Sequence, residues 1–188
     1  MTARAEVYRC AGETLELAQF LEEALALSII MLFIIEAGMQ KDFTPEEISK
    51  MIVEARRDQI PITSKPVTKK FQQNLQAQMG QVNLLVQTGS MGELKRTLES
   101  KLHVSPGGPS ASIEVLQGAL EARNHLCHGF FKSHFANTDT DAAIRSALSD
   151  LSDMKEKIQE AIGFANSLVA SLQDQFPITF SNFERRLH

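Results

Sequence analysis

The segment from Glu13 to Ala37 constrains the fold most, because it contains neither proline nor glycine and is followed by Gly38. Apolar side chains recur in it at intervals of three and four residues, the period of one helix face: Leu15, Ala18, Leu21, Leu25, Ile29, Leu32 and Ile35. A glycine directly after such a pattern is typical of a helix end. The sequence therefore predicts one long helix near the amino terminus.

The second half of this predicted helix is apolar on nearly all sides. The run from Ala24 to Ile35 is interrupted only by Ser28. A membrane-spanning helix needs about 20 apolar residues, so this run alone is too short. Acidic residues precede it, whereas a secretion signal carries a basic flank. We predict a helix that is buried either inside one domain or against a second copy, and apolarity alone does not separate these two.

The remaining sequence predicts further helices with clear breaks between them. They span about 44–59, 67–86, 91–102, a long helix that opens at Ser110 or Ser112, and about 141–175. Two prolines and two glycines within 103–110 predict a loop. No alternating strand pattern persists. We therefore expect a single all-α domain over residues 1–188, an antiparallel bundle of four to six helices with two long C-terminal helices.

Charge and cysteine content limit the classes of function. The formal net charge is −4, which argues against a broad non-specific grip on nucleic acid, although a local cationic pocket is compatible with it. Cys10 and Cys127 are too few for a disulfide framework. We therefore expect free thiols and a cytoplasmic location, with no membrane partner.

Residues 121–134 concentrate the side chains that bind phosphate and move protons. Three of the five histidines and one of the two cysteines lie there, and the segment contains Arg123, Asn124, His125, Cys127, His128, Lys132 and His134. An arginine can hold a phosphodiester and stabilise the charge that develops during attack. A histidine can accept or donate a proton near neutral pH. Together these groups suffice for cleavage of RNA by its own 2′-hydroxyl without a metal.

Helix geometry adds a condition to this interpretation. Arg123 and His128 lie about 140° apart around a straight helix, at 100° per residue. One such helix does not aim both side chains at one atom. They converge only if the helix distorts near Gly129 or if a second copy contributes, which favours a symmetric dimer. Asn124 lies one turn before His128 and is placed to position the imidazole or the phosphate.

The spacing Arg123-Asn124-x-x-x-His128 on a late, long helix resembles the signature of the HEPN superfamily in its Arg-x4-His form. Gly129-Phe130-Phe131 resembles the apolar continuation that often follows the histidine. The motif covers six residues, RNHLCH at 123–128. The resemblance implies a bundle of four to five helices that dimerises through the motif helix.

The resemblance further implies a metal-independent endoribonuclease of the toxin or phage-defence type. Arg123, His128 and Asn124 would be its catalytic residues at a composite dimer site. We expect Lys132, His125 and His134 to help bind the substrate. The expected partners are RNA, a second copy of the chain and a nucleotidyltransferase-type antitoxin, and no metal or cofactor is expected.

Two other interpretations are compatible with the same residues. The motif could serve only to cap and pack in a non-catalytic helical interaction module, whose apolar first helix docks a partner. Alternatively, Glu121, His125 and His128 share one helix face and are competent metal ligands. A di-metal carboxylate bundle, however, needs further Glu-x-x-His pairs from other helices.

Overall fold

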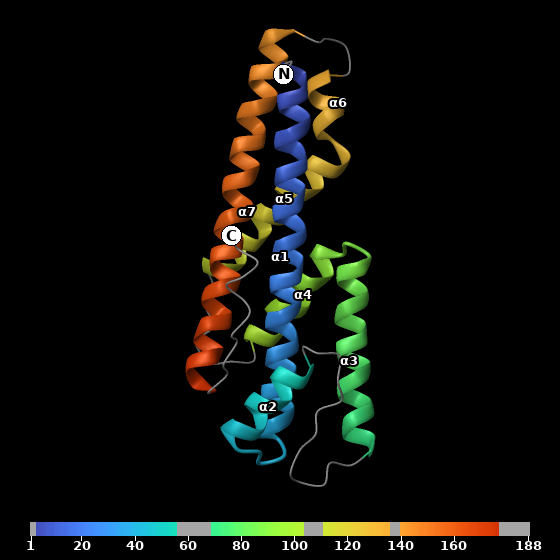
Figure 1. Ribbon diagram of the computed structural model, residues 1–188, viewed down its shortest axis with the longest axis vertical. Coiled ribbons are helices and arrows are strands. Elements are labelled where there is room, and N and C mark those ends of the chain that lie inside the picture. Colours follow the sequence, from blue (N-terminus) through green and yellow to red (C-terminus); the bar gives the residue numbers. More distant parts are fainter. Residues whose placement is uncertain (1–2, 56–68, 104–110, 136–139, 177–188) are drawn as a thin grey trace.

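The computed structural model describes residues 3–55, 69–103, 111–135 and 140–176, and within these residues all regular elements are helices (Figure 1). This confirms the predicted all-α class. The helices are α1 (Ala3–Met39), α2 (Pro45–Ala55), α3 (Lys69–Gln87), α4 (Met91–His103), α5 (Ala111–His128), α6 (Phe130–Phe135) and α7 (Asp141–Gln175). The predicted helix end near residue 59, the helix start at 67 and most of the 103–110 loop lie outside the described residues.

Helix α1 forms the axis of the molecule and packs against α2, α3, α4, α5 and α7 (Figure 1). The longest helix that packs against α1 is α7, which runs beside it in the same direction (Figure 1). An ion pair of 3.6 Å joins Glu13, in the first third of α1, to Lys155, near the middle of α7. Ile35 and Leu172 share one core cluster near the ends of the two helices. Consecutive helices mostly reverse direction, but this central pair is parallel.

The apolar half of α1 is buried by the other helices of the same chain. Ile29, Met31 and Ile34 have no exposed surface. By length and composition α1 could cross a membrane, but 61% of its most apolar window is buried inside the protein. Of the two predicted explanations for this run, burial within the domain is confirmed.

Helix α1 also begins earlier than the sequence pattern indicated. It starts at Ala3 and continues through Gly12 rather than beginning at Glu13. Val7 and Ala11 extend the buried stripe into this first part. Gly12 is exposed, and within the described part of the chain no atom lies within 4 Å of an added Cβ, so a glycine there does not interrupt the packing.

Two predicted helix starts have the capping contacts that their sequences suggested. Thr44 Oγ1 accepts a hydrogen bond from the Glu47 amide at 3.3 Å, and the Glu47 carboxylate accepts one from the Thr44 amide at 2.9 Å. This is a capping box. Thr140 caps α7 by accepting a hydrogen bond from the Ala143 amide at 3.2 Å. Helix α7 spans 141–175, as predicted.

Gly129 separates α5 from α6, which raises the helix count among the described residues to seven. Arg123 and His128 both precede this glycine within α5, so the break at Gly129 does not bring the two side chains together. Phe130 directly after it is fully buried, and Phe131 stacks on Tyr8 of α1 with ring centroids 5.2 Å apart. Through these and further contacts the short α6 packs against α1 and α7. The two long helices of the C-terminal half are α5 and α7.

Candidate functional site

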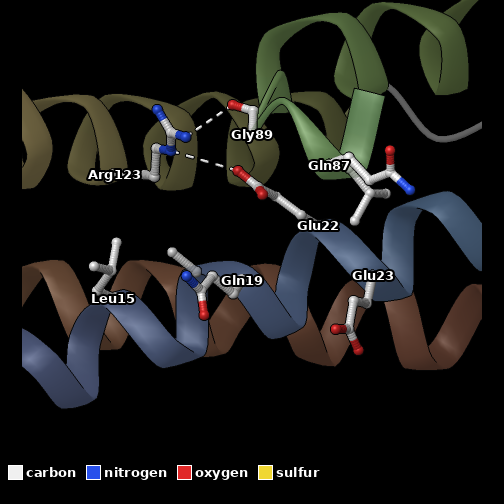
Figure 2. A pocket seen from close by; sticks show the side chains of 9 residues that line it. Leu15, Gln19, Glu22, Glu23, Gln87, Gly89 and Arg123 are labelled. Atoms are coloured by element: carbon white, nitrogen blue, oxygen red, sulfur yellow. Dashed lines mark hydrogen bonds and ion pairs between the residues drawn. The ribbon is translucent and has the colours of Figure 1, made fainter. Parts of the chain in front are cut away.

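Helix α5 carries the motif, and its arginine points into the protein. Arg123 Nε lies 3.4 Å from Glu22 Oε1 of α1, and Nη2 donates a 2.8 Å hydrogen bond to the Gly89 carbonyl (Figure 2). The Arg123 side chain is 20% exposed and that of Glu22 only 6%. The third nitrogen, Nη1, lies 3.5 Å from Asn124 Oδ1. Arg123 thus ties α5 to α1 and to the end of α3.

The Arg123–Glu22 pair lines a hollow of about 300 Å³ between α1, the end of α3 and α5. Its wall also includes Leu15, Ala18, Gln19, Glu23, Val86, Gln87 and Gly89 (Figure 2). Burial raises the pKa of the Glu22 carboxyl above its ordinary value of 4.5, while the Arg123 guanidinium opposes that rise. The positive charge of Arg123 therefore offsets the cost of burying an ionised Glu22 carboxylate.

Gly89 completes the arginine's surroundings through its backbone. Its φ of +60° lies in the left-handed region that glycine adopts without strain, at the end of α3. An added Cβ would lie 2.7 Å from Arg123 Nη2. The glycine therefore serves both to end the helix and to admit the guanidinium.

Gly89→Ala should destabilise the protein by about 1–2 kcal/mol, because it places a side chain at positive φ and displaces Arg123. Gly80→Ala is the matched control, since Gly80 lies inside α3 and no described residue comes within 4 Å of an added Cβ there. That substitution should stabilise the protein by about 0.5–1 kcal/mol. Urea denaturation of both variants gives the comparison, and equal effects would contradict the role assigned to Gly89.

Asn124 and His128 are exposed on α5, whereas Arg123 is partly buried. Among the described residues, no side chain hydrogen-bonds or forms an ion pair with the imidazole of His128. Asn124 contacts the guanidinium of Arg123 rather than that imidazole. One copy of the chain therefore brings Arg123 and Asn124 together and leaves His128 accessible at the surface.

A second hollow, of about 270 Å³, lies next to the motif and is apolar. It is lined by Tyr8, Ala11, Gly12, Leu15, Leu126, Cys127 and Phe131. Tyr8, Leu15 and Phe131 are among the large apolar side chains that remain exposed in the described part of the chain. Leu15 borders both hollows, so the polar and apolar sites form one continuous stretch of surface along α1.

The residues predicted to assist substrate binding fall into two places. Lys132 is exposed on α6. His134 is largely buried, and its Nε2 lies 2.9 Å from Asp150 Oδ2 of α7. His125 Nε2 lies 3.7 Å from the same oxygen. The structure thus groups His125 with His134 and Asp150, rather than with Glu121, which accepts a hydrogen bond from Gln117.

Sequence reasoning missed three residues of these groups, namely Glu22, Gly89 and Asp150. Glu22 carried a usable signal, because it adjoins Leu21 and precedes Leu25 by one turn within the buried stripe of α1. A carboxylate at such a position requires a partner. Asp150 lies sixteen positions after His134, and no spacing rule connects them.

The resemblance to the HEPN superfamily rests on the motif residues themselves. Arg123, Asn124 and His128 do lie on one helix that precedes the last long helix, as the resemblance implies. The bundle, however, has seven helices in its described part, against the four to five implied. No family model, curated protein or solved structure matches this chain.

Proposed function

We propose that the protein is a metal-independent endoribonuclease that acts as a homodimer in the cytoplasm, in a toxin or defence role. The observation that carries this proposal is the arrangement on α5, where an oriented Arg123 at a surface hollow precedes an accessible His128 by just over one turn. Phosphate binding and proton transfer are the two tasks that RNA cleavage requires.

Arg123 supplies a positioned cation. Glu22 and the Gly89 carbonyl fix two of its nitrogens, which leaves Nη1, beside Asn124, to meet a phosphate oxygen. A guanidinium held in this way needs little reorganisation when charge develops on the phosphorus oxygens. Asn124 is placed to donate an amide hydrogen to the same phosphate.

His128 would carry the proton transfers. The ribose 2′-hydroxyl attacks the adjacent phosphorus, and its proton passes to an imidazole nitrogen. The bond from phosphorus to the 5′-oxygen breaks, and that oxygen receives a proton. The products are a 2′,3′-cyclic phosphate and a 5′-hydroxyl end, and no step requires a metal.

A second copy of the chain would complete the site. Arg123 and His128 of one copy lie about 140° apart around α5, so they do not address one phosphate together. A two-fold axis beside α5 would pair Arg123 of one copy with His128 of the other. The exposed apolar hollow around Tyr8 and Phe131 borders the motif and offers the surface that such a dimer would bury.

Incubation of RNA with the purified protein in EDTA tests the proposal. We expect cleavage that leaves 2′,3′-cyclic phosphate ends, and a DNA strand of the same sequence should stay intact because it lacks the 2′-hydroxyl. Specific activity should fall when the protein is diluted below its dimer dissociation constant. Cleavage that disappears in EDTA, or that also cuts the DNA strand, would contradict the mechanism.

One observation favours a second candidate, a non-catalytic helical interaction module. Glu22 pairs with Arg123 within the chain and Glu23 also lines the hollow, so its wall has more carboxylates than cations. The apolar surface at Tyr8, Leu15 and Phe131 would then be the surface that binds a partner. A folded dimer that cleaves none of a broad panel of RNAs would support this candidate.

A further inference from the structure

We propose that His125, His134 and Asp150 form a binding site for a divalent transition metal such as Zn²⁺. The three residues come from three different helices, α5, α6 and α7. One ligand atom from each lies within 4.8 Å of the other two. Among the described residues, this is the one group of three histidine, cysteine or carboxylate side chains whose ligand atoms lie this close together. The proposal does not depend on RNA cleavage.

The ligand types and their spacing suit Zn²⁺. Imidazole nitrogens and carboxylate oxygens bind this ion at about 2.0–2.2 Å, so ligand atoms around a tetrahedral ion lie about 3.3 Å apart. Asp150 Oδ2 is 2.9 Å from His134 Nε2 and 3.7 Å from His125 Nε2, values on either side of that spacing. Rotation of the half-exposed His125 ring can bring its Nε2 closer to that spacing from Asp150 Oδ2.

The surroundings orient both imidazoles. The fully buried Phe130 ring packs near both of them, with its centroid 4.9 Å from that of His134 and 6.3 Å from that of His125. Gly129 makes room for His125, because an added Cβ would lie 3.0 Å from its Nδ1. Both rings present Nε2 to Asp150. Packing against the Phe130 ring limits how far they can rotate.

The site is accessible to an ion from solvent. The Asp150 side chain is 46% exposed and that of His125 is 41% exposed, whereas His134 is 10% exposed and forms the inner wall. Three protein ligands leave a fourth tetrahedral position for water. The short α6 packs against α5 and α7, and a bound metal would cross-link these three helices.

Titration of the full chain with Zn²⁺ by calorimetry tests the proposal. We expect one equivalent to bind and the melting temperature to rise with free Zn²⁺. Asp150→Asn keeps a hydrogen-bond acceptor but removes the anionic ligand, and it should weaken binding at least about tenfold and reduce the thermal shift at the same free Zn²⁺. Asp153→Asn, at an exposed carboxylate one turn further along α7, should leave both unchanged.

Gly129→Ala provides a second variant that keeps all three ligands. Its methyl group should push the His125 ring and weaken Zn²⁺ binding, while circular dichroism shows that the helices persist. Visible absorption of bound Co²⁺ should report a four-coordinate site in the wild type and lose intensity in Asp150→Asn. Equal affinity of wild type and Asp150→Asn, or no stoichiometric binding, would overturn the proposal.

Discussion

Arg123→Met should lower the free energy of unfolding by about 3 kcal/mol at neutral pH, because it leaves the buried Glu22 carboxylate without its partner. The Gly89 carbonyl would lose its donor as well. For a chain of this length the melting temperature should fall by about 6–12 °C. Chemical denaturation and calorimetry measure both quantities. Arg96→Met, at an exposed arginine that pairs with Glu93, should change stability by less than about 0.5 kcal/mol.

The same variant should show a diagnostic dependence on pH. Burial raises the pKa of Glu22, and Arg123 works against that rise, so Arg123→Met should raise the pKa further. A carboxyl with a raised pKa binds more protons in the folded state, so its cost to stability appears as pH rises through that pKa and disappears on acidification. The stability difference from wild type should therefore shrink below neutral pH.

A second substitution isolates the interaction between Glu22 and Arg123 from the contacts that each side chain makes with other residues. Glu22→Gln combined with Arg123→Met should recover most of the lost stability, because a neutral amide costs far less to bury than an unpaired carboxylate. A double-mutant cycle gives the coupling energy between the two side chains. Additive effects at all pH values would show that Glu22 and Arg123 act independently.

His128→Ala should reduce RNA cleavage by about 10²–10⁴-fold without changing stability. The imidazole is exposed, and no described residue bonds to it, so its removal leaves no buried group unpaired. Rates of substrate loss under single-turnover conditions measure the effect, and thermal melting confirms the fold. Gln117→Ala, at an exposed position earlier on α5, should cleave at the wild-type rate.

The two motif residues therefore call for different experiments. Loss of activity in Arg123→Met alone would reflect either chemistry or unfolding. The double variant with Glu22→Gln resolves this, since a folded but inactive protein would place Arg123 at the reacting phosphate. Undiminished cleavage by His128→Ala would instead assign the activity to a contaminant or to other residues, and would remove His128 from the mechanism.

The all-α fold and most helix boundaries could be predicted because they depend on local rules. The period of apolar residues, the Thr44 and Thr140 caps and the break at Gly89 and Ser90 act within a few residues of chain. The motif helix was identified for the same reason. The earlier start of α1 was missed because Gly12 resembles a helix break in sequence, although it lies on an exposed face where glycine costs only about 1 kcal/mol.

Only the tertiary structure decided what the motif side chains contact. Glu22 meets Arg123 across roughly one hundred residues of chain, and Asp150 meets His125 and His134 because α7 packs on both α5 and α6. The sequence alone determined that helices form and which faces are apolar, since that information lies in neighbouring residues. It did not determine which charged groups meet, because such meetings depend on how the helices cross and turn, here at Gly129 and along the parallel pair of α1 and α7.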